Sequence, residues 1–180
     1  MTGVVLGLIA GIAFGYVITR VGATNPEKMA RAHLMMEPAI PQFMLTAVAA
    51  AAIGLTGLVA VGRADLSPLP TSLVATGLAA VIFGVGWGLA GYCPGTTWAA
   101  VGEGRMDAVF ALLGGLVGTA VFAHFHEAII PVLYGPTNVG KITLMDALGD
   151  SRIAATVALV TVFGLGVWAI GKLWTRSYDA

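Results

Sequence analysis

The chain has 180 residues, of which 58% are hydrophobic and only 10% are charged, and its formal net charge at pH 7 is zero. A typical soluble domain carries about 25% charged residues, so this composition excludes an ordinary soluble fold with a polar surface. The neutral balance gives no basic surface for nucleic acid, and a single cysteine excludes an internal disulfide and an all-cysteine zinc site. We expect no cofactor, no metal and no nucleic-acid partner.

Long apolar runs divide the chain, and their length is that of membrane spans, because about 20 residues cross the hydrocarbon layer. Lys172, near the end of the last run, is the only Lys, Arg, Asp or Glu in five runs: Gly3–Thr19, Phe43–Val61, Leu73–Tyr92, Ala108–Phe125 and Ile153–Trp174. The pattern predicts an all-α integral membrane protein with about five transmembrane helices. We expect one membrane domain over residues 1–180, multi-pass in the inner (plasma) membrane and surrounded by the lipid bilayer.

A glycine and a short polar break follow the first and third runs. Two segments after these breaks, Pro26–Met36 and Pro94–Gly102, are too short to cross a bilayer. Each has a proline near its start, a position that the first turn of a helix tolerates. Side chains that could cap the free N–H groups lie beside them: Thr24, Asn25, Cys93 and Thr96. The pattern predicts two short half-helices, and the alternative is two ordinary surface loops.

The unit of span, break, short segment and span occurs twice. When Phe14-Gly15 is placed over Phe83-Gly84, Gly22 aligns with Gly91 and Thr24 aligns with Cys93, and the two prolines are offset by one residue. We predict repeat 1 over about 1–62, repeat 2 over about 70–125, and an extra loop and helix over 126–180. Repeats with interrupted apolar segments are the best sequence indication of a transporter binding site.

Cys93 is the sharpest single candidate for a functional residue. It lies between Gly91 and Pro94 at the start of a predicted half-helix, where backbone N–H groups and the helix dipole favour an anion. The alternative is that Cys93 is a small apolar filler, which is the usual role of a lone cysteine in a membrane span.

The segment from Phe83-Gly84 through Gly91-Tyr92-Cys93-Pro94-Gly95-Thr96 to Gly102-Glu103-Gly104-Arg105 resembles the YeeE/YedE family of sulfur-compound transporters. Phe14-Gly15 through Gly22 to Pro26 is similar to that family's first motif. The resemblance implies a permease, not an enzyme, for a sulfur-containing anion such as thiosulfate. It implies a substrate path lined by Cys93, Thr24, Gly91, Pro94, Gly95, Thr96 and Asn25. It also implies a structural or gating role for Glu103 and Arg105, and the alternative for these two residues is a solvated loop with Arg105 at the membrane interface.

The chain also departs from that family. Longer members are about twice this length, and Thr24 stands where their first motif cysteine would be. The resemblance therefore implies that two chains, as a homodimer or as a pair with a related membrane chain, complete the pore.

The resulting hypothesis is that half-helix N-termini, the Cys93 thiol and the Thr24 hydroxyl donate hydrogen bonds to the ion at several weak sites. Two alternatives stay open. One is a membrane sulfurtransferase that forms a persulfide on Cys93, although the motif offers no general base for it. The other is a structural subunit with no path of its own.

Overall fold

The computed structural model describes residues 2–135, 137–147, 149 and 151–178. Over these residues the regular secondary structure is helical, apart from one isolated bridge between Ser72 and Asn138. The helices in chain order are α1 (Thr2–Val21), α2 (Pro26–His33), α3 (Ala39–Ala60), α4 (Leu73–Ala90), α5 (Pro94–Gly102), α6 (Met106–Tyr134), α7 (Leu144–Ala147) and α8 (Arg152–Tyr178). Five stretches are long and apolar enough to cross a membrane, which confirms the predicted all-α membrane class.

Both predicted half-helices are present. α5 has the predicted bounds, and α2 begins at the predicted Pro26 but ends at His33, because the next turn closes with Met35 in a left-handed conformation (φ 59°). The predicted loop is wrong from His126 to Tyr134, where α6 continues. The polar residues after Phe125 do not break a helix, and Pro131 removes only one backbone hydrogen bond from it.

The chain forms two compact units, each built from two separate segments. The first unit contains Met1–Ile40 and Ala80–Ala128, and the second contains Pro41–Ala79 and Ile129–Ala180. Both breaks and both half-helices therefore belong to the first unit. The predicted boundaries of the repeats and of the single membrane domain stay a prediction.

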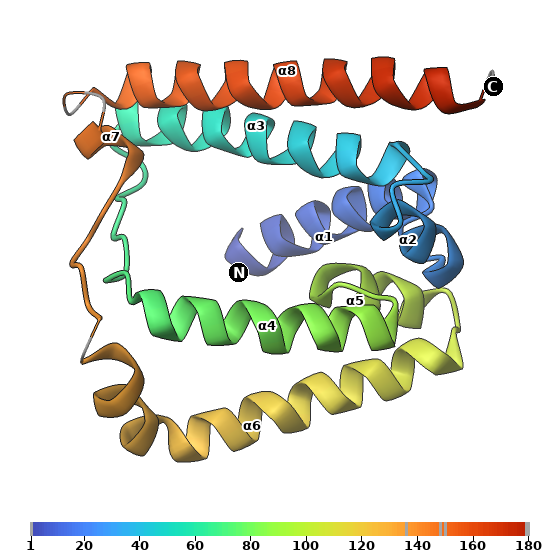
Figure 1. Ribbon diagram of the computed structural model, residues 1–180, viewed down its shortest axis with the longest axis horizontal. Helices are drawn as coiled ribbons and strands as arrows, with labels where there is room; N and C mark the ends of the chain where they lie inside the picture. Colours follow the sequence, from blue (N-terminus) through green and yellow to red (C-terminus); the bar gives the residue numbers. More distant parts are fainter. Residues whose placement is uncertain (1, 136, 148, 150, 179–180) are drawn as a thin grey trace. The chain divides into compact units, whose positions relative to one another are not determined.

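The second unit is held by the pairing of α3 with α8, which run side by side in Figure 1. The hydroxyls of Thr56 and Thr156 lie 2.7 Å apart, and the Gln42 amide donates to the Val167 carbonyl at 3.2 Å. Polar side chains in membrane bundles commonly form such bonds between helices. The pairing therefore uses hydrogen bonds as well as apolar contact.

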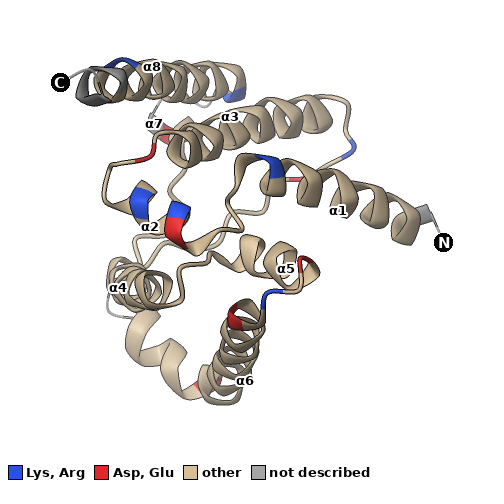
Figure 2. Cartoon of the chain, turned by 90° about the vertical axis from the view of Figure 1, so that its right-hand side faces the viewer, with Lys and Arg blue, Asp and Glu red and all other residues tan. Residues whose placement is uncertain are grey.

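Charged residues are concentrated near helix ends and on α2, as the colouring of Figure 2 shows. α3 and α4 contain no Lys, Arg, Asp or Glu, and α1 has only Arg20, in its last turn. The two half-helices differ in this respect. α2 (PEKMARAH) carries four ionisable side chains in eight residues, whereas α5 (PGTTWAAVG) carries none.

Candidate functional site

Each break begins at a glycine that ends a long helix in a left-handed conformation. Gly22 has φ 78°, and hydrogen bonds from Gly22 N to Thr19 O (3.0 Å) and from Ala23 N to Ile18 O (3.2 Å) close the end of α1. Gly91 has φ 71° at the end of α4. This two-bond closure is the Schellman motif, in which glycine is favoured because it has no Cβ.

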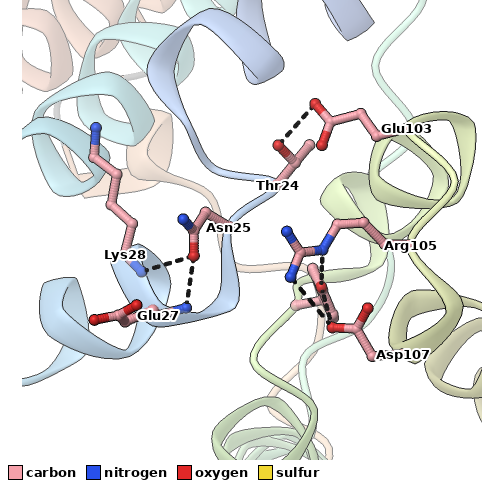
Figure 3. Close-up of polar contacts among 8 residues, drawn as sticks. Thr24, Asn25, Glu27, Lys28, Glu103, Arg105 and Asp107 are labelled. Carbon is pink, nitrogen blue, oxygen red and sulfur yellow. Dashed lines mark hydrogen bonds and ion pairs between the residues drawn. The ribbon is translucent and has the colours of Figure 1, made fainter.

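The N-terminus of α2 is capped by Asn25. Its side-chain oxygen accepts hydrogen bonds from Glu27 N (2.9 Å) and Lys28 N (3.4 Å), as Figure 3 shows. Pro26, at the first position of the helix, has no N–H group. The first-turn donors of α2, which we expected to be open to an ion, are therefore already bonded.

The N-terminus of α5 is capped by Cys93, whose backbone is extended (φ −83°, ψ 161°). Its Sγ accepts from Thr96 N (3.4 Å), and its own N donates to Thr96 Oγ1 (3.0 Å), so the two residues form a capping box. Thr97 Oγ1 donates to the Cys93 carbonyl at 2.8 Å. Thr96, predicted as a path residue, is itself buried and bonded to Cys93.

One donor of this first turn is left. Pro94 has no N–H, and within the described part of the chain Gly95 N has no hydrogen-bond partner. The Gly95 amide lies two residues after the Cys93 thiol. The start of α5 thus places a thiol and an unpaired backbone donor next to each other at the positive end of a helix dipole.

The two breaks touch each other directly. A Cβ added to Gly91 would lie 2.9 Å from Pro26 Cβ and 3.5 Å from Pro26 Cα, so only glycine allows this approach. A Cβ on Gly95 would lie 3.7 Å from the ring of Phe14 in α1. Of the predicted path residues, Gly91 thus lies against the first break and Gly95 lies against α1.

Thr24 links the first break to the far end of α5. Its side chain is buried, and its hydroxyl donates to Glu103 Oε1 at 3.0 Å (Figure 3). Glu103 is the C-terminal cap of α5, and its backbone N–H bonds the Ala99 carbonyl. The Thr24 hydroxyl, predicted as a second donor to the ion, therefore donates its hydrogen bond to the Glu103 carboxylate in this structure.

The structure also changes which residues correspond between the two breaks. The sequence register placed Thr24 opposite Cys93. Three residues lie between Gly22 and Pro26, but only two lie between Gly91 and Pro94, and each proline is the first residue of its half-helix. Asn25 and Cys93 are thus the equivalent N-terminal caps, and the first break has one residue more than the second.

Three residues outside the predicted path form a polar cluster beside Cys93. Tyr92 is buried, and its hydroxyl donates to Asp107 Oδ2 (2.6 Å) and accepts from Arg105 Nε (2.8 Å). Arg105 Nη2 lies 3.5 Å from Asp107 Oδ2 (Figure 3). The hydrogen bond to Tyr92 raises the pKa of Arg105 above its ordinary value, so the guanidinium stays charged. An Arg-x-Asp pair after the half-helix was the only sequence signal for this cluster.

A cavity of about 960 Å³ lies among α4, α5 and α6 in the first unit. Its lining is mostly apolar and includes Trp87, Tyr92, Pro94 and Thr97. The cavity therefore reaches the first turn of α5, but Cys93 itself is not part of its lining.

Comparison with protein families decides the class of the protein. A family model described as "Sulphur transport" matches residues 26–179. The chain belongs to this family. Membership in the sulphur-transport family confirms the resemblance found in the sequence and makes the chain a multi-pass membrane protein of a transporter family. The match contains the Cys93 break and α5, and begins after Thr24 and Asn25. The search of curated proteins and the search of solved structures found no match.

Proposed function

We propose that this member of the sulphur-transport family is a permease for a sulfur-containing anion, with thiosulfate as its substrate, and that the ion passes Cys93 at the start of α5. The observation that carries the proposal is the arrangement of that helix start. A thiol caps the helix, and the adjacent Gly95 N–H has no partner among the described residues. Donors at a helix N-terminus favour an anion.

The chemistry of the thiol suits a terminal sulfur atom. A sulfur oxyanion is costly to dehydrate, so donors along the path must replace part of its water shell. Cys93 Sγ accepts hydrogen bonds from Thr96, which leaves its own proton free to donate. A thiol is a weak donor with a polarizable sulfur, and several weak sites let an ion leave as well as enter.

The other predicted path residues take more specific roles in this proposal. Gly91 and Pro94 shape the break. Asn25 donates to the ion in place of Thr24, the donor expected from the sequence. The side-chain oxygen of Asn25 accepts hydrogen bonds from the first turn of α2, and its NH₂ group remains as a donor. The hydrogen bond between Thr24 and Glu103 holds the first break against the C-terminal end of α5, and Arg105 takes part in gating together with these two residues.

We also propose that the protein acts in the inner membrane and that two chains, identical or related, complete the pore. A stripe of glycines along α1 supports this: Gly3, Gly7, Gly11 and Gly15 have no atom within 4 Å of an added Cβ. Glycines at four-residue spacing allow close packing of membrane helices. Light scattering in detergent tests the assembly, and a transport-active monomer contradicts it.

Uptake of labelled thiosulfate, sulfite and sulfate into proteoliposomes tests the permease. Cys93→Ser is the decisive variant, because serine also caps a helix and leaves the fold intact, whereas Cys93→Ala removes the cap as well. We expect Cys93→Ser to lower thiosulfate uptake, because a hydroxyl is smaller, harder and less polarizable than a thiol. Cys93→Ala should lower uptake further, by about fivefold for the loss of one hydrogen bond worth roughly 1 kcal/mol, because it removes the donor. A thiol reagent should block the wild type and spare Cys93→Ser.

Three results would contradict parts of this proposal: the first concerns the role of Cys93, and the other two concern the permease itself. Wild-type uptake by normally expressed Cys93→Ala would show that Cys93 only fills space. A persulfide on Cys93, found by mass spectrometry in a protein that transports nothing, would favour the sulfurtransferase. Absence of uptake and of persulfide, in liposomes that hold this chain alone, would favour a structural subunit.

A further inference from the structure

α5 is too short to hold its own position. It has nine residues, and isolated helices of fewer than about 12 residues are marginal even in favourable sequences. Its capping box orients Cys93 relative to the helix, but does not fix the helix in the protein. The contacts that hold the ends of α5 therefore decide where the Cys93 thiol lies.

Tyr92 connects the two ends of α5. Its backbone directly precedes Cys93, and its ring packs in one buried cluster with Ala100, in the last turn of α5, and Ala108, in the first turn of α6. Its hydroxyl is held by Arg105 and Asp107, which follow the C-terminus of α5. The phenol thus ties the start of the half-helix to the turn that comes after its end.

The bonding of this phenol is complete. The hydroxyl donates a hydrogen bond to Asp107 Oδ2 at 2.6 Å and accepts one from Arg105 Nε at 2.8 Å. Both partners are charged, and hydrogen bonds with a charged partner are stronger than neutral ones. Tyr92 is only 4% exposed, whereas the Arg105 and Asp107 side chains are 34% and 54% exposed, so these two side chains hold a buried ring through its hydroxyl.

We propose that Tyr92 is a positioning residue for transport, and that through Arg105 and Asp107 it holds Cys93 at the place where the ion passes. This role rests on the proposed function, because it concerns the same thiol. It differs from gating by Arg105 alone, since the phenol is the group that both charged side chains hold.

The test measures the position of the thiol independently of transport. Cys93 is the only cysteine, so the rate at which purified protein reacts with a maleimide reports on this residue alone. Tyr92→Phe keeps the buried ring and removes both hydrogen bonds. We expect the alkylation rate to rise about threefold or more and thiosulfate uptake to fall about threefold to tenfold, the factors that loss of such bonds implies.

Matched variants separate positioning from general damage. Tyr16→Phe makes the same chemical change on α1, where the side chain is 64% exposed, and should leave both rates unchanged. Asp107→Asn keeps an acceptor for the phenol, so its effect should be smaller than that of Asp107→Ala. Graded effects in this order would show that the alkylation rate and the uptake depend on the hydrogen bond to Tyr92, and not only on the presence of α5.

An unchanged alkylation rate in Tyr92→Phe overturns the proposal, and so does unchanged uptake in that variant. Failure of the proposed function is seen separately, because it appears as no uptake by the wild-type protein or as wild-type uptake by Cys93→Ala. A faster reaction of Cys93 together with slower uptake in Tyr92→Phe, with Tyr16→Phe at the wild-type values, supports the positioning role.

Discussion

Replacing Gly91 by alanine tests whether the two breaks touch. The new Cβ would lower the stability of the protein in two separate ways. A left-handed conformation costs a residue other than glycine about 1–2 kcal/mol, and Gly91 has φ 71°. The Cβ would also lie 2.9 Å from Pro26 Cβ, and forcing an extra methyl group into a packed site costs about 1–3 kcal/mol. Gly91→Ala should therefore destabilise the protein by about 2–5 kcal/mol.

Gly62→Ala is the matched control. Gly62 has φ 72°, but no atom lies within 4 Å of its added Cβ, so only the backbone cost of about 1–2 kcal/mol applies. Thermal unfolding in detergent, followed by size-exclusion chromatography, compares the two variants. At about 2–4 °C per kcal/mol, the melting temperature should fall by roughly 4–20 °C for Gly91→Ala and roughly 2–8 °C for Gly62→Ala.

The contact itself is tested by a double variant. Pro26→Gly removes the Cβ that the new methyl group meets, so it should restore about 1–3 kcal/mol to Gly91→Ala when the costs of the single changes are subtracted. Additive effects, or equal losses for Gly91→Ala and Gly62→Ala, would refute the reasoning, because Pro26 would then not lie against Gly91.

Three further predictions concern other parts of the chain. Asn25→Ala should destabilise the protein by about 1 kcal/mol in thermal unfolding, whereas Asn25→Asp should be tolerated, because aspartate also caps a helix; equal losses would contradict the cap. Thr56→Val should cost about 0.6 kcal/mol, and the same change in Thr156→Val should add nothing, since either one breaks the bond between α3 and α8. Lys172→Cys in a Cys93→Ser background should react with an impermeant reagent only from the cytoplasmic side, because the Lys and Arg residues of the loops favour an external N-terminus.

The sequence predicted the helices well because membrane spans depend on length and polarity alone. α4 begins at the predicted Leu73, and α5 has the predicted bounds Pro94–Gly102, since glycine, proline and capping residues mark both ends of that segment. The end of α6 was missed because His126 and Glu127 were interpreted as a loop. In the bilayer, residues of this kind can continue a helix toward the interface.

The candidate site was predicted less completely, because it depends on contacts between distant residues. Nothing in the sequence indicates that the Thr24 hydroxyl reaches Glu103, 79 positions away. The correspondence of Asn25 with Cys93 could not be read from a register set by the glycines, because the first break has one residue more. The backbone geometry beside the proline decides which residue caps the helix, and an alignment of the two breaks does not contain that geometry.

The division of the chain into two interleaved units has a consequence for biogenesis. The two segments that form the first unit are separated in the sequence by the 39 residues Pro41–Ala79, which belong to the second unit. At about 5–20 residues per second, the ribosome needs several seconds to bridge that gap. A nascent chain released before Ala80 would complete neither unit. A gene split in the loop before α4 should therefore yield halves that mature only when both are expressed in the same cell.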